Sequence, residues 1–261
     1  MLHAMRDEVL RTKADLGLGF DGDGDRCGIV DDTGDEIFAD KVGVMLARDM
    51  SALHPNSTFV VDVKSTGLYA TDPVLIKNGV KADYWKTGHS YMKRRTHEVG
   101  ALAGFEKSGH YFFNKPFGRG YDDGLVSALA VCDMMDRSPG KSMADLKNAL
   151  PKTWGSPTMS PHCEDEKKYG IVEQVVKHFE AMQAKGEQLL GQPIRDLVTV
   201  NGVRITVQDG TWGLVRASSN KPELVVVVES PVSEARMREM FKAVDNVLRT
   251  HPEVGAYNQT I

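Results

Sequence analysis

The sequence predicts the α/β fold class, with a mixed, layered α/β/α domain followed by a small α+β domain that contains an antiparallel sheet. Strand-like apolar runs alternate with helix-period segments through residues 37–150, which is the pattern of a mostly parallel sheet. Three or four strand-like runs then follow one another directly within residues 196–230, which favours an antiparallel sheet. Between these parts, residues 151–165 contain three prolines and no regular period.

The first elements in chain order are a helix over residues 2–13 and a strand over residues 14–20. The apolar side chains at helical spacing are those of Leu2, Met5, Val9 and Leu10. The strand runs into an acidic loop, and an apolar run on the far side of the loop completes a hairpin. A helix and a hairpin cannot form a core alone, so we expect this opening segment to pack on something else, which can lie outside this chain.

The segment of residues 37–150 contains the alternating elements. The expected strands are residues 57–63, 80–86 and 101–107. The expected helices are residues 41–50 with Asp40 as the N-cap, residues 67–79, residues 89–99, residues 123–137 and residues 142–150. Residues 112–123 are expected to form a long surface connection whose aromatic side chains pack against the domain.

The last part, residues 151–261, begins with the proline-rich segment, which we interpret as a linker. A long helix is expected over residues 169–183. The expected strands are residues 196–200, 202–207, 211–217 and 224–230, with a turn at Asp209-Gly210. A final helix is expected over residues 233–250.

The composition is that of an ordinary globular protein. Of 261 residues, 41% are hydrophobic and 26% charged, and 32 basic against 36 acidic residues give a net charge of −4. This balance gives no support to a general nucleic-acid binder or a binder of anionic membranes. No apolar run approaches the ~20 residues needed to span a bilayer, and we expect a cytoplasmic protein. The three cysteines, Cys27, Cys132 and Cys163, lack a C-x-x-C spacing and are expected to be reduced thiols.

The stretch DGDGDR, residues 21–26, places Asp21, Asp23 and Asp25 at alternate positions between two strand-like runs. Carboxylates about 6 Å apart repel by roughly 3 kcal/mol per pair at an effective dielectric constant near 20. A bound cation would remove this cost, and the glycines allow the side chains to converge on one point. The strand context favours a magnesium-type site, with Arg26 directed at the same anion.

Two other interpretations of this acidic loop remain. A D-G-D stretch is often a plain hairpin turn. An EF-hand calcium loop fits less well, because Arg26 stands where that motif has glycine and Asp32 stands where it has glutamate. The flanking runs also predict strands, whereas an EF-hand loop lies between two helices.

Polar loops follow four of the predicted strands. They are Lys64-Ser65-Thr66-Gly67, Lys86 to Ser90 with Lys93, Arg94 and Arg95 beyond it, Glu106 to His110, and Arg216 to Pro222. Ligands of α/β sheets gather at the carboxyl ends of strands. Hydroxyls, imidazoles, cations and a carboxylate suit a polyhydroxylated anion. Each loop also has a plainer interpretation: His89 or His110 as a surface histidine, Lys93 to Arg95 as a solvated helix face, and Ser218 to Asn220 as a turn.

Four of these motifs, taken together and in order, resemble those of the α-D-phosphohexomutases, and specifically the bacterial phosphomannomutase/phosphoglucomutase branch. They are DGDGDR at 21–26, TGHSYMK at 87–93, GFEKSGH at 104–110 and RASSNKP at 216–222. The resemblance covers essentially the whole chain. It implies that residues 1–36 are the C-terminal remnant of a metal-binding second domain, that residues 37–150 form a sugar-recognition domain, and that residues 151–261 form a phosphate-binding C-terminal domain.

The resemblance also implies a role for individual residues. Asp21, Asp23 and Asp25 are implied to hold Mg²⁺, with Arg26 close to the transferring phosphoryl group. Glu106 and Ser108 are implied to bind sugar hydroxyls, and His110 to transfer a proton or position the substrate. Lys64 and His89 are implied to line the substrate site. Arg216, Ser218, Ser219 and Asn220 are implied to hold the phosphate that does not react.

Three features depart from the family pattern. Ser219-Asn220 stand where the R-x-S-N-T pattern has Asn-Thr, and Gly-Phe-Glu-Lys stands where Gly-Glu-Met is usual. The phosphoserine segment of the T-A-S-H-N type does not occur in this sequence. We therefore expect a C-terminal piece of a mutase that lacks the phosphoserine domain and is inactive alone.

The reaction implied for the complete enzyme, an isomerase, is interconversion of hexose 1-phosphate and 6-phosphate through a phosphoserine and a hexose 1,6-bisphosphate. The implied partners are glucose or mannose phosphates, the bisphosphate and the missing N-terminal domains. A non-catalytic sugar-phosphate-binding module is the alternative function, and a calcium-binding structural protein is a third. The sequence does not distinguish glucose from mannose, because both would present hydroxyls to Glu106 and Ser108.

Overall fold

The structure is a computed structural model that describes the backbone of residues 2–261 and the side chains of residues 3–261. The expected apolar position Leu2 therefore lies outside the described side chains. The chain divides into two compact units, Met1–Pro151 and Lys152–Ile261. The predicted fold class is confirmed, because an α/β unit is followed by a unit built on an antiparallel sheet. Among residues 2–261, no helix is both long and apolar enough to cross a membrane.

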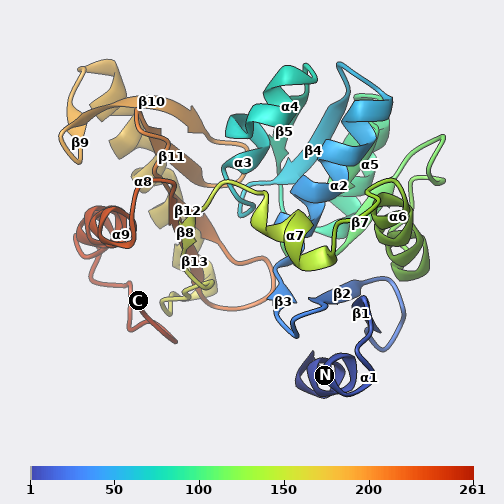
Figure 1. The fold of residues 1–261 in the computed structure, drawn as a ribbon. Coiled ribbons are helices and arrows are strands. Elements are labelled where there is room, and N and C mark those ends of the chain that lie inside the picture. The colour runs from blue at the N-terminus through green and yellow to red at the C-terminus, as the bar shows by residue number, and fades with distance from the viewer. Residues whose placement is uncertain (1) are drawn as a thin grey trace. The chain divides into compact units, whose positions relative to one another are not determined.

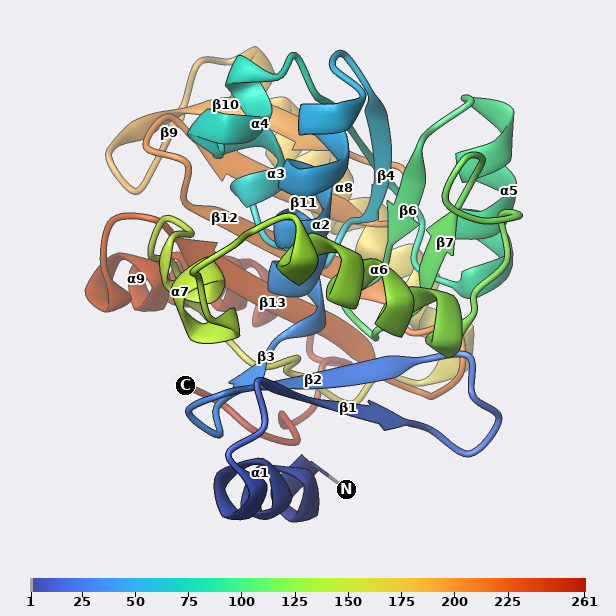
Figure 2. The same ribbon diagram turned by 45° about the vertical axis from the view of Figure 1, so that its right-hand side comes forward.

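The first unit opens with a helix on a small antiparallel sheet, as expected. The elements are α1 (Leu2–Thr12), β1 (Leu16–Phe20), β2 (Cys27–Asp31) and β3 (Glu36–Ile37), with strand order β1-β2-β3. The helix lies close to the sheet because Gly17 has no side chain: a Cβ there would lie 2.8 Å from Met5 and Val9. Figure 2 shows α1 beside β1 and β2, with the β1–β2 loop extending past the ends of these strands.

The larger part of this unit is a four-stranded sheet. Its elements in chain order are α2 (Ala39–Leu53), β4 (Thr58–Asp62), α3 (Leu68–Thr71), α4 (Pro73–Lys77), β5 (Lys81–Trp85), α5 (His89–Glu98), β6 (Ala103–Phe105), β7 (Tyr111–Phe113), α6 (Gly124–Asp136) and α7 (Met143–Asn148). The strand order is β5-β4-β6-β7. Strand β4 is parallel to β5 and β6, and β7 is antiparallel to β6. The carboxyl ends of β4, β5 and β6 therefore meet at one edge, where the predicted loops begin.

The alternation of buried side chains in β4 explains the layers. Phe59 and Val61 belong to the core that includes α2 and α6, whereas Val60 packs with Met92 of α5 on the opposite face. Figure 2 shows α2 and α6 on one side of the sheet and α5 on the other. The result is the three-layer arrangement that alternating strands and helices predict.

Three local predictions in this unit are wrong. Asp40 is not an N-cap: α2 begins at Ala39, two residues earlier than predicted, and its N-cap is Phe38. The buried Asp40 carboxylate instead accepts a hydrogen bond from Thr66 N at 3.0 Å. The single helix expected over residues 67–79 is two short helices, because Asp72 caps α4 and Pro73 is its first residue. The connection expected over residues 112–123 begins too early, because Phe112 and Phe113 belong to strand β7, although their side chains are buried as expected.

The second unit is a six-stranded antiparallel sheet with two helices. Its elements are β8 (Trp154–Gly155), α8 (Asp165–Ala184), β9 (Gln188–Leu189), β10 (Gln192–Val198), β11 (Val203–Val207), β12 (Trp212–Ala217), β13 (Leu224–Ser230) and α9 (Glu234–Leu248). The strand order is β8-β13-β12-β11-β10-β9 (Figure 1). Apolar side chains of α8 and α9 share one core with alternate residues of β11, β12 and β13, so both helices cover the same face of the sheet.

The linker predicted at residues 151–165 is wrong for most of that segment. Strand β8 pairs with β13, Ser156 exchanges hydrogen bonds with Val228, and Met159 is fully buried. Prolines are tolerated at sheet edges because they interrupt only one side of the ladder. The segment is therefore the edge of the second unit's sheet, and that sheet has more strands than the three or four predicted.

Candidate functional site

The acidic loop closes the β1–β2 hairpin. Phe20 pairs with Cys27, so residues 21–26 form the connection, and Gly24 adopts a φ of 76° that favours glycine. The predicted ligands Asp21, Asp23 and Asp25 each offer a carboxylate oxygen, and these oxygens lie within 4.8 Å of one another. The three alternating carboxylates therefore converge on one point.

Arg26 makes the main charge contacts of this loop. Its Nε lies 2.6 Å from Asp21 Oδ2, and its backbone N–H donates to Asp21 Oδ1 at 3.2 Å. The same Nε lies 3.7 Å from Asp25 Oδ1. Partial burial raises the pKa of Asp21, but the Arg26 hydrogen bonds outweigh it and lower that pKa to about 2.

Asp25 has the opposite electrostatic character. Desolvation raises the pKa of its carboxyl, the His110 charge lowers it, and the neighbouring carboxylates of Asp23, Asp21 and Asp122 raise it further. Its Oδ1 atom is buried and has no hydrogen-bond partner among the described residues. Buried acceptors are nearly always satisfied, so this oxygen fits a cation held by the acidic loop. Hard oxygen donors are also the ligands that Mg²⁺ prefers.

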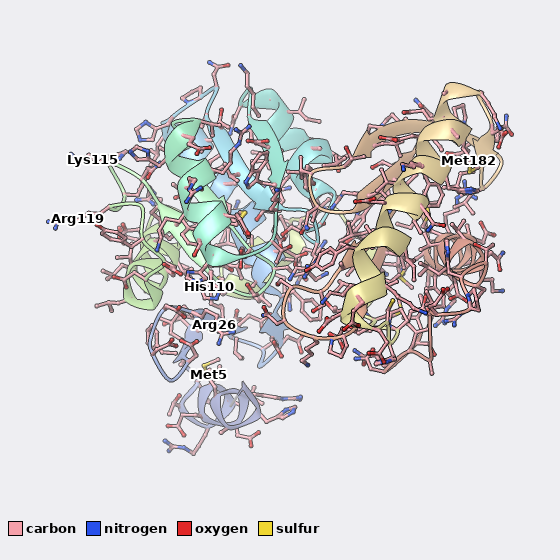
Figure 3. The ribbon with its side chains drawn as sticks, turned by 180° about the vertical axis from the view of Figure 1, so that it is seen from behind. Met5, Arg26, His110, Lys115, Arg119 and Met182 are labelled. Carbon is pink, nitrogen blue, oxygen red and sulfur yellow. The ribbon has the colours of Figure 1, made fainter. Side chains whose placement is uncertain are left out.

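The start of α6 holds this loop in place. The Gly124 N–H donates to Gly24 O at 2.9 Å, and a Cβ on Gly124 would lie only 2.7 Å from Gly24 O and from Arg26 O. Glycine is therefore required for this close approach. On the loop's other side, Arg26 forms an antiparallel bridge with His110, and Figure 3 shows these two residues as neighbours. The acidic loop is thus joined by backbone to the 106–110 loop.

The 106–110 loop connects β6 to β7 and presents two predicted sugar ligands. Glu106 is buried, and its carboxylate accepts hydrogen bonds from Gly88 N at 2.7 Å and from Ser108 Oγ at 2.8 Å. Desolvation raises the pKa of Glu106, and the nearby Asp62 charge raises it further. The carboxylate keeps lone pairs that can accept a hydroxyl donor.

Asp62, the last residue of β4, links the neighbouring loops. Its buried carboxylate accepts from Ser65 Oγ and from Thr87 Oγ1 at 3.2 Å, and Lys64 Nζ lies 3.5 Å from Asp62 Oδ2. The backbone N–H of Lys107 also donates to it at 3.4 Å. Asp62 was not among the residues predicted from the sequence, although an acidic residue at the end of an apolar strand is a usable signal.

Two predicted site histidines share another carboxylate that the sequence analysis missed. Asp122 Oδ2 lies 3.3 Å from His110 Nδ1 and 3.5 Å from His89 Nδ1, and Lys93 Nζ lies 3.4 Å from Asp122 Oδ1. The two imidazole rings stack with centroids 6.0 Å apart. Asp25 Oδ2 lies 3.6 Å from His110 Nδ1, which connects this cluster to the acidic loop. The adjacent aspartates of the YDDG stretch were the only sequence signal for Asp122.

The other two basic residues of α5 belong to the helix surface. Arg95 pairs with Asp83 at 2.7 Å and stacks on Trp85, and Arg94 is exposed. The solvated-face interpretation therefore holds for these two, whereas Lys93 reaches Asp122.

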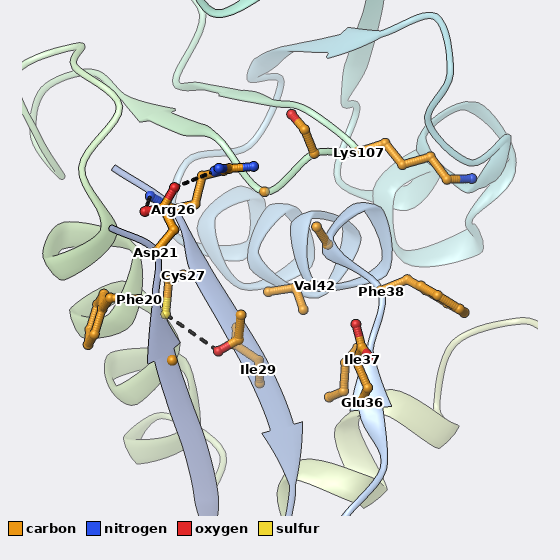
Figure 4. Close-up of a pocket in the computed structure, with 15 residues that line it drawn as sticks. Phe20, Asp21, Arg26, Cys27, Ile29, Glu36, Ile37, Phe38, Val42 and Lys107 are labelled. Carbon is orange, nitrogen blue, oxygen red and sulfur yellow. Dashed lines mark hydrogen bonds and ion pairs between the residues drawn. The ribbon is translucent and has the colours of Figure 1, made fainter. Parts of the chain in front are cut away.

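A cavity of about 340 Å³ adjoins the acidic loop. Its polar lining includes Asp21, Arg26, Lys107 and Ser108. Figure 4 shows Arg26 beside Asp21, with Val42 projecting from α2 into the apolar part of the lining. Residues of the acidic loop and of the 106–110 loop therefore line a common space.

The four predicted phosphate ligands lie in the second unit. Arg216 is not in a loop but is the fifth residue of β12, where it is largely buried and donates through Nη1 to Ala217 O at 2.9 Å. Ser218 Oγ accepts from Asn220 N at 3.4 Å and from Lys221 N at 3.3 Å. These bonds form the turn that the sequence also allowed. Ser219 and Asn220 are exposed on it.

The turn is tied to α8 by a buried lysine. Lys168 is 2% exposed, and its Nζ donates to Lys221 O at 3.0 Å and pairs with Asp165. The loop therefore has a fixed position on its own unit.

Comparison with known proteins gives matches over nearly the whole chain. The family description "Phosphoglucomutase/phosphomannomutase, alpha/beta/alpha domain III" matches residues 38–154, and "Phosphoglucomutase/phosphomannomutase, C-terminal domain" matches residues 162–247. A phosphomannomutase/phosphoglucomutase of Pseudomonas putida is 33% identical over 95% of this chain and 50% of its own length. A phosphoglucomutase of Neisseria meningitidis is 32% identical over 88% of this chain and 47% of its own length.

Solved structures agree with these sequence matches. A phosphoglucomutase/phosphomannomutase family protein of Burkholderia thailandensis superposes with a TM-score of 0.80 at 27% identity, over 97% of this chain and 51% of that one. An N-acetylphosphoglucosamine mutase of Aspergillus fumigatus, solved with GlcNAc-6P and magnesium, has a TM-score of 0.58 at 12% identity over 94% of this chain and 52% of that one, which shows a shared fold alone.

The chain spans about half the length of the curated relatives that it matches. The two family domains together cover most of its residues, in the order found in the family. The chain therefore belongs to the phosphoglucomutase/phosphomannomutase family of α-D-phosphohexomutases.

Proposed function

We propose that this chain provides the metal-binding and sugar-phosphate-binding part of a phosphohexomutase. The complete enzyme would interconvert hexose 1-phosphate and hexose 6-phosphate through a phosphoserine and a hexose 1,6-bisphosphate. One observation carries the proposal: the acidic loop, the Glu106–Ser108 pair and the two histidines form one connected cluster in the first unit. Carboxylates for a cation thus lie beside groups suited to hydroxyls.

The acidic loop is proposed to hold Mg²⁺ through Asp21, Asp23 and Asp25. The convergent oxygens support this assignment, as does Asp25 Oδ1, which is buried and has no hydrogen-bond partner among the described residues. When bound, Mg²⁺ would neutralise charge on the phosphoryl group during transfer. Arg26 is proposed to contact the same phosphoryl group. To do so, its guanidinium would have to leave the Asp21 carboxylate and donate hydrogen bonds to the phosphate oxygens instead.

The sugar is proposed to bind through Glu106 and Ser108, with Lys64 and His89 lining the site and His110 moving or positioning a proton. The hydrogen bonds of Glu106 to Gly88 and Ser108 fix the carboxylate before the sugar arrives, which lowers the cost of ordering it. Glucose and mannose phosphates would both present hydroxyl groups to Glu106 and Ser108.

The second unit is proposed to hold the phosphate that does not react. Arg216 would supply the charge, and Ser218, Ser219 and Asn220 would supply hydrogen-bond donors. The fixed position of the turn through Lys168 supports this assignment. A phosphate held away from the reacting group would orient the sugar without taking part in the chemistry.

The chain by itself is proposed to bind without turnover, because its 261 residues contain no phosphoserine segment of the T-A-S-H-N type. Conversion of glucose 1-phosphate by the purified chain, in a coupled assay with glucose 1,6-bisphosphate as primer, would contradict this. Restoration of activity by adding the N-terminal half of a relative in trans would support it. No activity in either case, with binding retained, would favour the non-catalytic sugar-phosphate-binding module.

Calorimetry tests the binding itself. Glucose 1-phosphate and mannose 1-phosphate are titrated into the chain with Mg²⁺ present, and glucose and inorganic phosphate serve as matched controls. We expect saturable binding of the sugar phosphates that is tighter than that of either control. Absence of sugar-phosphate binding would overturn the proposed function. Tight Ca²⁺ binding combined with indifference to Mg²⁺ and sugar phosphate would favour the calcium-binding structural protein instead.

A further inference from the structure

Asp122 stands at the centre of the imidazole cluster without a role in the proposed chemistry. Its side chain is 10% exposed, and its Oδ2 faces the Nδ1 atoms of both His110 and His89, at 3.3 and 3.5 Å. Its other oxygen faces Lys93 Nζ at 3.4 Å. One oxygen is therefore directed at the two rings, and the other is paired with a cation.

The position of Asp122 is set by backbone on both sides. Its own backbone bridges to Phe112 of β7, and the next residue, Asp123, caps α6 by accepting from Leu125 N at 2.9 Å and Val126 N at 3.1 Å. A carboxylate anchored in this way can orient a neighbouring ring at a small entropic cost.

His110 has the matching need for a partner. Its Nδ1 atom is buried and has no hydrogen-bond partner among the described residues. A buried imidazole N–H requires an acceptor, and hydrogen bonds of unliganded sites are often long and shorten in the complex. The available acceptors are Asp122 Oδ2 and, farther away, Asp25 Oδ2 at 3.6 Å. Asp25 is already proposed as a cation ligand, whereas Asp122 is not, so Asp122 is the better acceptor for His110 Nδ1.

We propose that Asp122 is a positioning residue that keeps His110 in the tautomer with its proton on Nδ1. Nε2 is then the nitrogen that takes the proton of the sugar hydroxyl: the O–H bond breaks, an Nε2–H bond forms, and Asp122 stabilises the resulting imidazolium. The same carboxylate oxygen holds the Nδ1 edge of His89, so the stacked rings keep a common orientation. The role of His110 in proton transfer rests on the proposed function. The claim that Asp122 sets the tautomer of His110 does not depend on it.

One rival arrangement uses the same residues. Asp25, His110 and Asp122 each offer a ligand atom within 4.8 Å of the others, so a cation held there would take Nδ1 as a ligand. The proton would then lie on Nε2, which is also the form that predominates in free histidine. The tautomer of His110 thus separates the two arrangements.

Long-range ¹H–¹⁵N correlation spectra of the histidine rings test the proposal on the full chain, which has eight histidines. His110→Gln and His89→Gln assign the two signals, at a pH where the rings are neutral. We expect His110 to carry its proton on Nδ1 with or without Mg²⁺. Asp122→Asn should shift it at least several-fold toward the Nε2–H form, and Asp122→Glu should restore part of the native signal.

Two variants make the result specific. Asp123→Asn keeps the cap of α6 and should leave the His110 signal unchanged. The proposal is overturned if wild-type His110 carries its proton on Nε2 or if Asp122→Asn leaves the spectrum unaltered. It is also overturned if the tautomer changes in Asp25→Asn and not in Asp122→Asn.

Addition of glucose 1-phosphate tests the functional half separately. We expect it to move the ¹⁵N resonance of His110 Nε2 more than that of Nδ1, and more than those of the histidines outside the cluster. A larger movement of Nδ1 would overturn the proton-transfer role. No movement of any ring, with the Nδ1–H tautomer present, would count against the proposed function and leave the positioning by Asp122 standing.

Discussion

At the scale of single residues, Glu106 shows a conflict between stability and the proposed binding role. Its carboxylate is 2% exposed, and desolvation together with the Asp62 charge raises its pKa. A carboxyl group whose pKa is raised by folding contributes stability below its usual pKa, and that stability is lost as the pH rises through the folded value. Ionisation of the Glu106 carboxyl group therefore weakens the fold.

The variant Glu106→Gln tests this conflict. The amide keeps an acceptor for Gly88 N and a polar partner for Ser108, so we expect the variant to fold. Its melting temperature should equal or exceed that of the wild type at pH 7, and the difference should grow as the pH rises from 4. Its affinity for glucose 1-phosphate should fall by about tenfold, since hydrogen bonds to charged groups contribute about 1.5–3 kcal/mol.

Thermal unfolding from pH 4 to 8 and calorimetry measure the two effects. Glu98→Gln is the matched control, because Glu98 is an exposed residue of α5 in the same unit. A strongly destabilised Glu106→Gln at pH 7, or one that binds sugar phosphate as well as the wild type does, would contradict both expectations.

Residues that act through others were the ones missed by sequence reasoning. The alternating aspartates are local, so their spacing predicted them, whereas the roles of Glu106, Ser108 and His110 were implied by the resemblance to the family. Besides its near neighbours Lys64 and Ser65, Asp62 contacts Thr87 and Lys107, which lie 25 and 45 positions away. Asp122 contacts His110 and His89, which lie 12 and 33 positions away. Such contacts depend on how strands and loops are brought together, and adjacent positions in the sequence do not encode them directly.

At the scale of elements, the start of α6 supports the acidic loop through Gly124. A Cβ at this position would meet two backbone oxygens at 2.7 Å, so Gly124→Ala must displace either the helix or the loop. We expect it to reduce stability and to weaken Mg²⁺ binding about tenfold, although every ligand is retained. Chemical unfolding and Mg²⁺ calorimetry measure these effects.

Gly170→Ala is the matched control in helix α8. A Cβ there meets nothing within 4 Å, so alanine should raise stability by about 0.5–1 kcal/mol through its better helix propensity. Its Mg²⁺ affinity should remain unchanged. Equal behaviour of the two variants would show that α6 does not hold the loop.

The hairpin of β2 and β3 is joined to α7 by an ion pair. Asp31 is fully buried, and its carboxylate pairs with Lys147 and accepts hydrogen bonds from Thr33 and Asp35. Burial raises the pKa of Asp31, but these partners outweigh it and lower the pKa overall. A carboxyl group with a lowered pKa contributes stability above its usual value near 3.9, and this is lost as the pH falls through the folded pKa.

The variant Lys147→Met should therefore lose stability in a pH-dependent way. We expect a loss of about 2–3 kcal/mol at pH 7, because a buried carboxylate is left without its cation. The loss should shrink below about pH 4, where Asp31 is protonated in the unfolded chain. Urea unfolding at pH 3, 5 and 7 measures it, and the exposed Lys141→Met is the control. A deficit that is constant with pH would exclude the ion pair as its cause.

Local periodicity predicted most elements, and the errors have physical causes. The Asp72-Pro73 pair is itself a helix-start signal, but the apolar spacing continued through it and suggested one helix. Strand β7 has only three residues and precedes a loop with lysine, proline and glycine, so it resembled a connection. Aspartate is a common N-cap residue, which favoured Asp40 as the N-cap. Its carboxylate instead accepts a hydrogen bond from Thr66 N, which is distant in the sequence.

At the scale of the whole molecule, the chain comprises two units, each with its own core. The second unit contains its own sheet, and the segment interpreted as a linker supplies its edge strand. We therefore expect residues 152–261 to fold alone with a cooperative unfolding transition. A shorter piece, residues 166–261, loses β8 and buried Met159 and should be less stable by more than about 3 kcal/mol.

Circular dichroism during urea unfolding compares the two pieces. Equal stability would mean that residues 152–165 do not contribute to the second unit and would restore the linker interpretation. Failure of the longer piece to unfold cooperatively would show that this unit depends on the rest of the chain.

The measurement that tests the central claim most directly is the affinity for Mg²⁺ with and without glucose 1,6-bisphosphate, in the wild type and in Asp23→Asn. If the acidic loop holds the cation beside the sugar phosphate, the wild type should bind one Mg²⁺, and the bisphosphate should tighten that binding at least about tenfold. Asp23→Asn should lose most of both effects, which separates binding at the loop from chelation by the free bisphosphate. Mg²⁺ binding that is absent, that ignores the bisphosphate, or that survives unchanged in Asp23→Asn would contradict the claim.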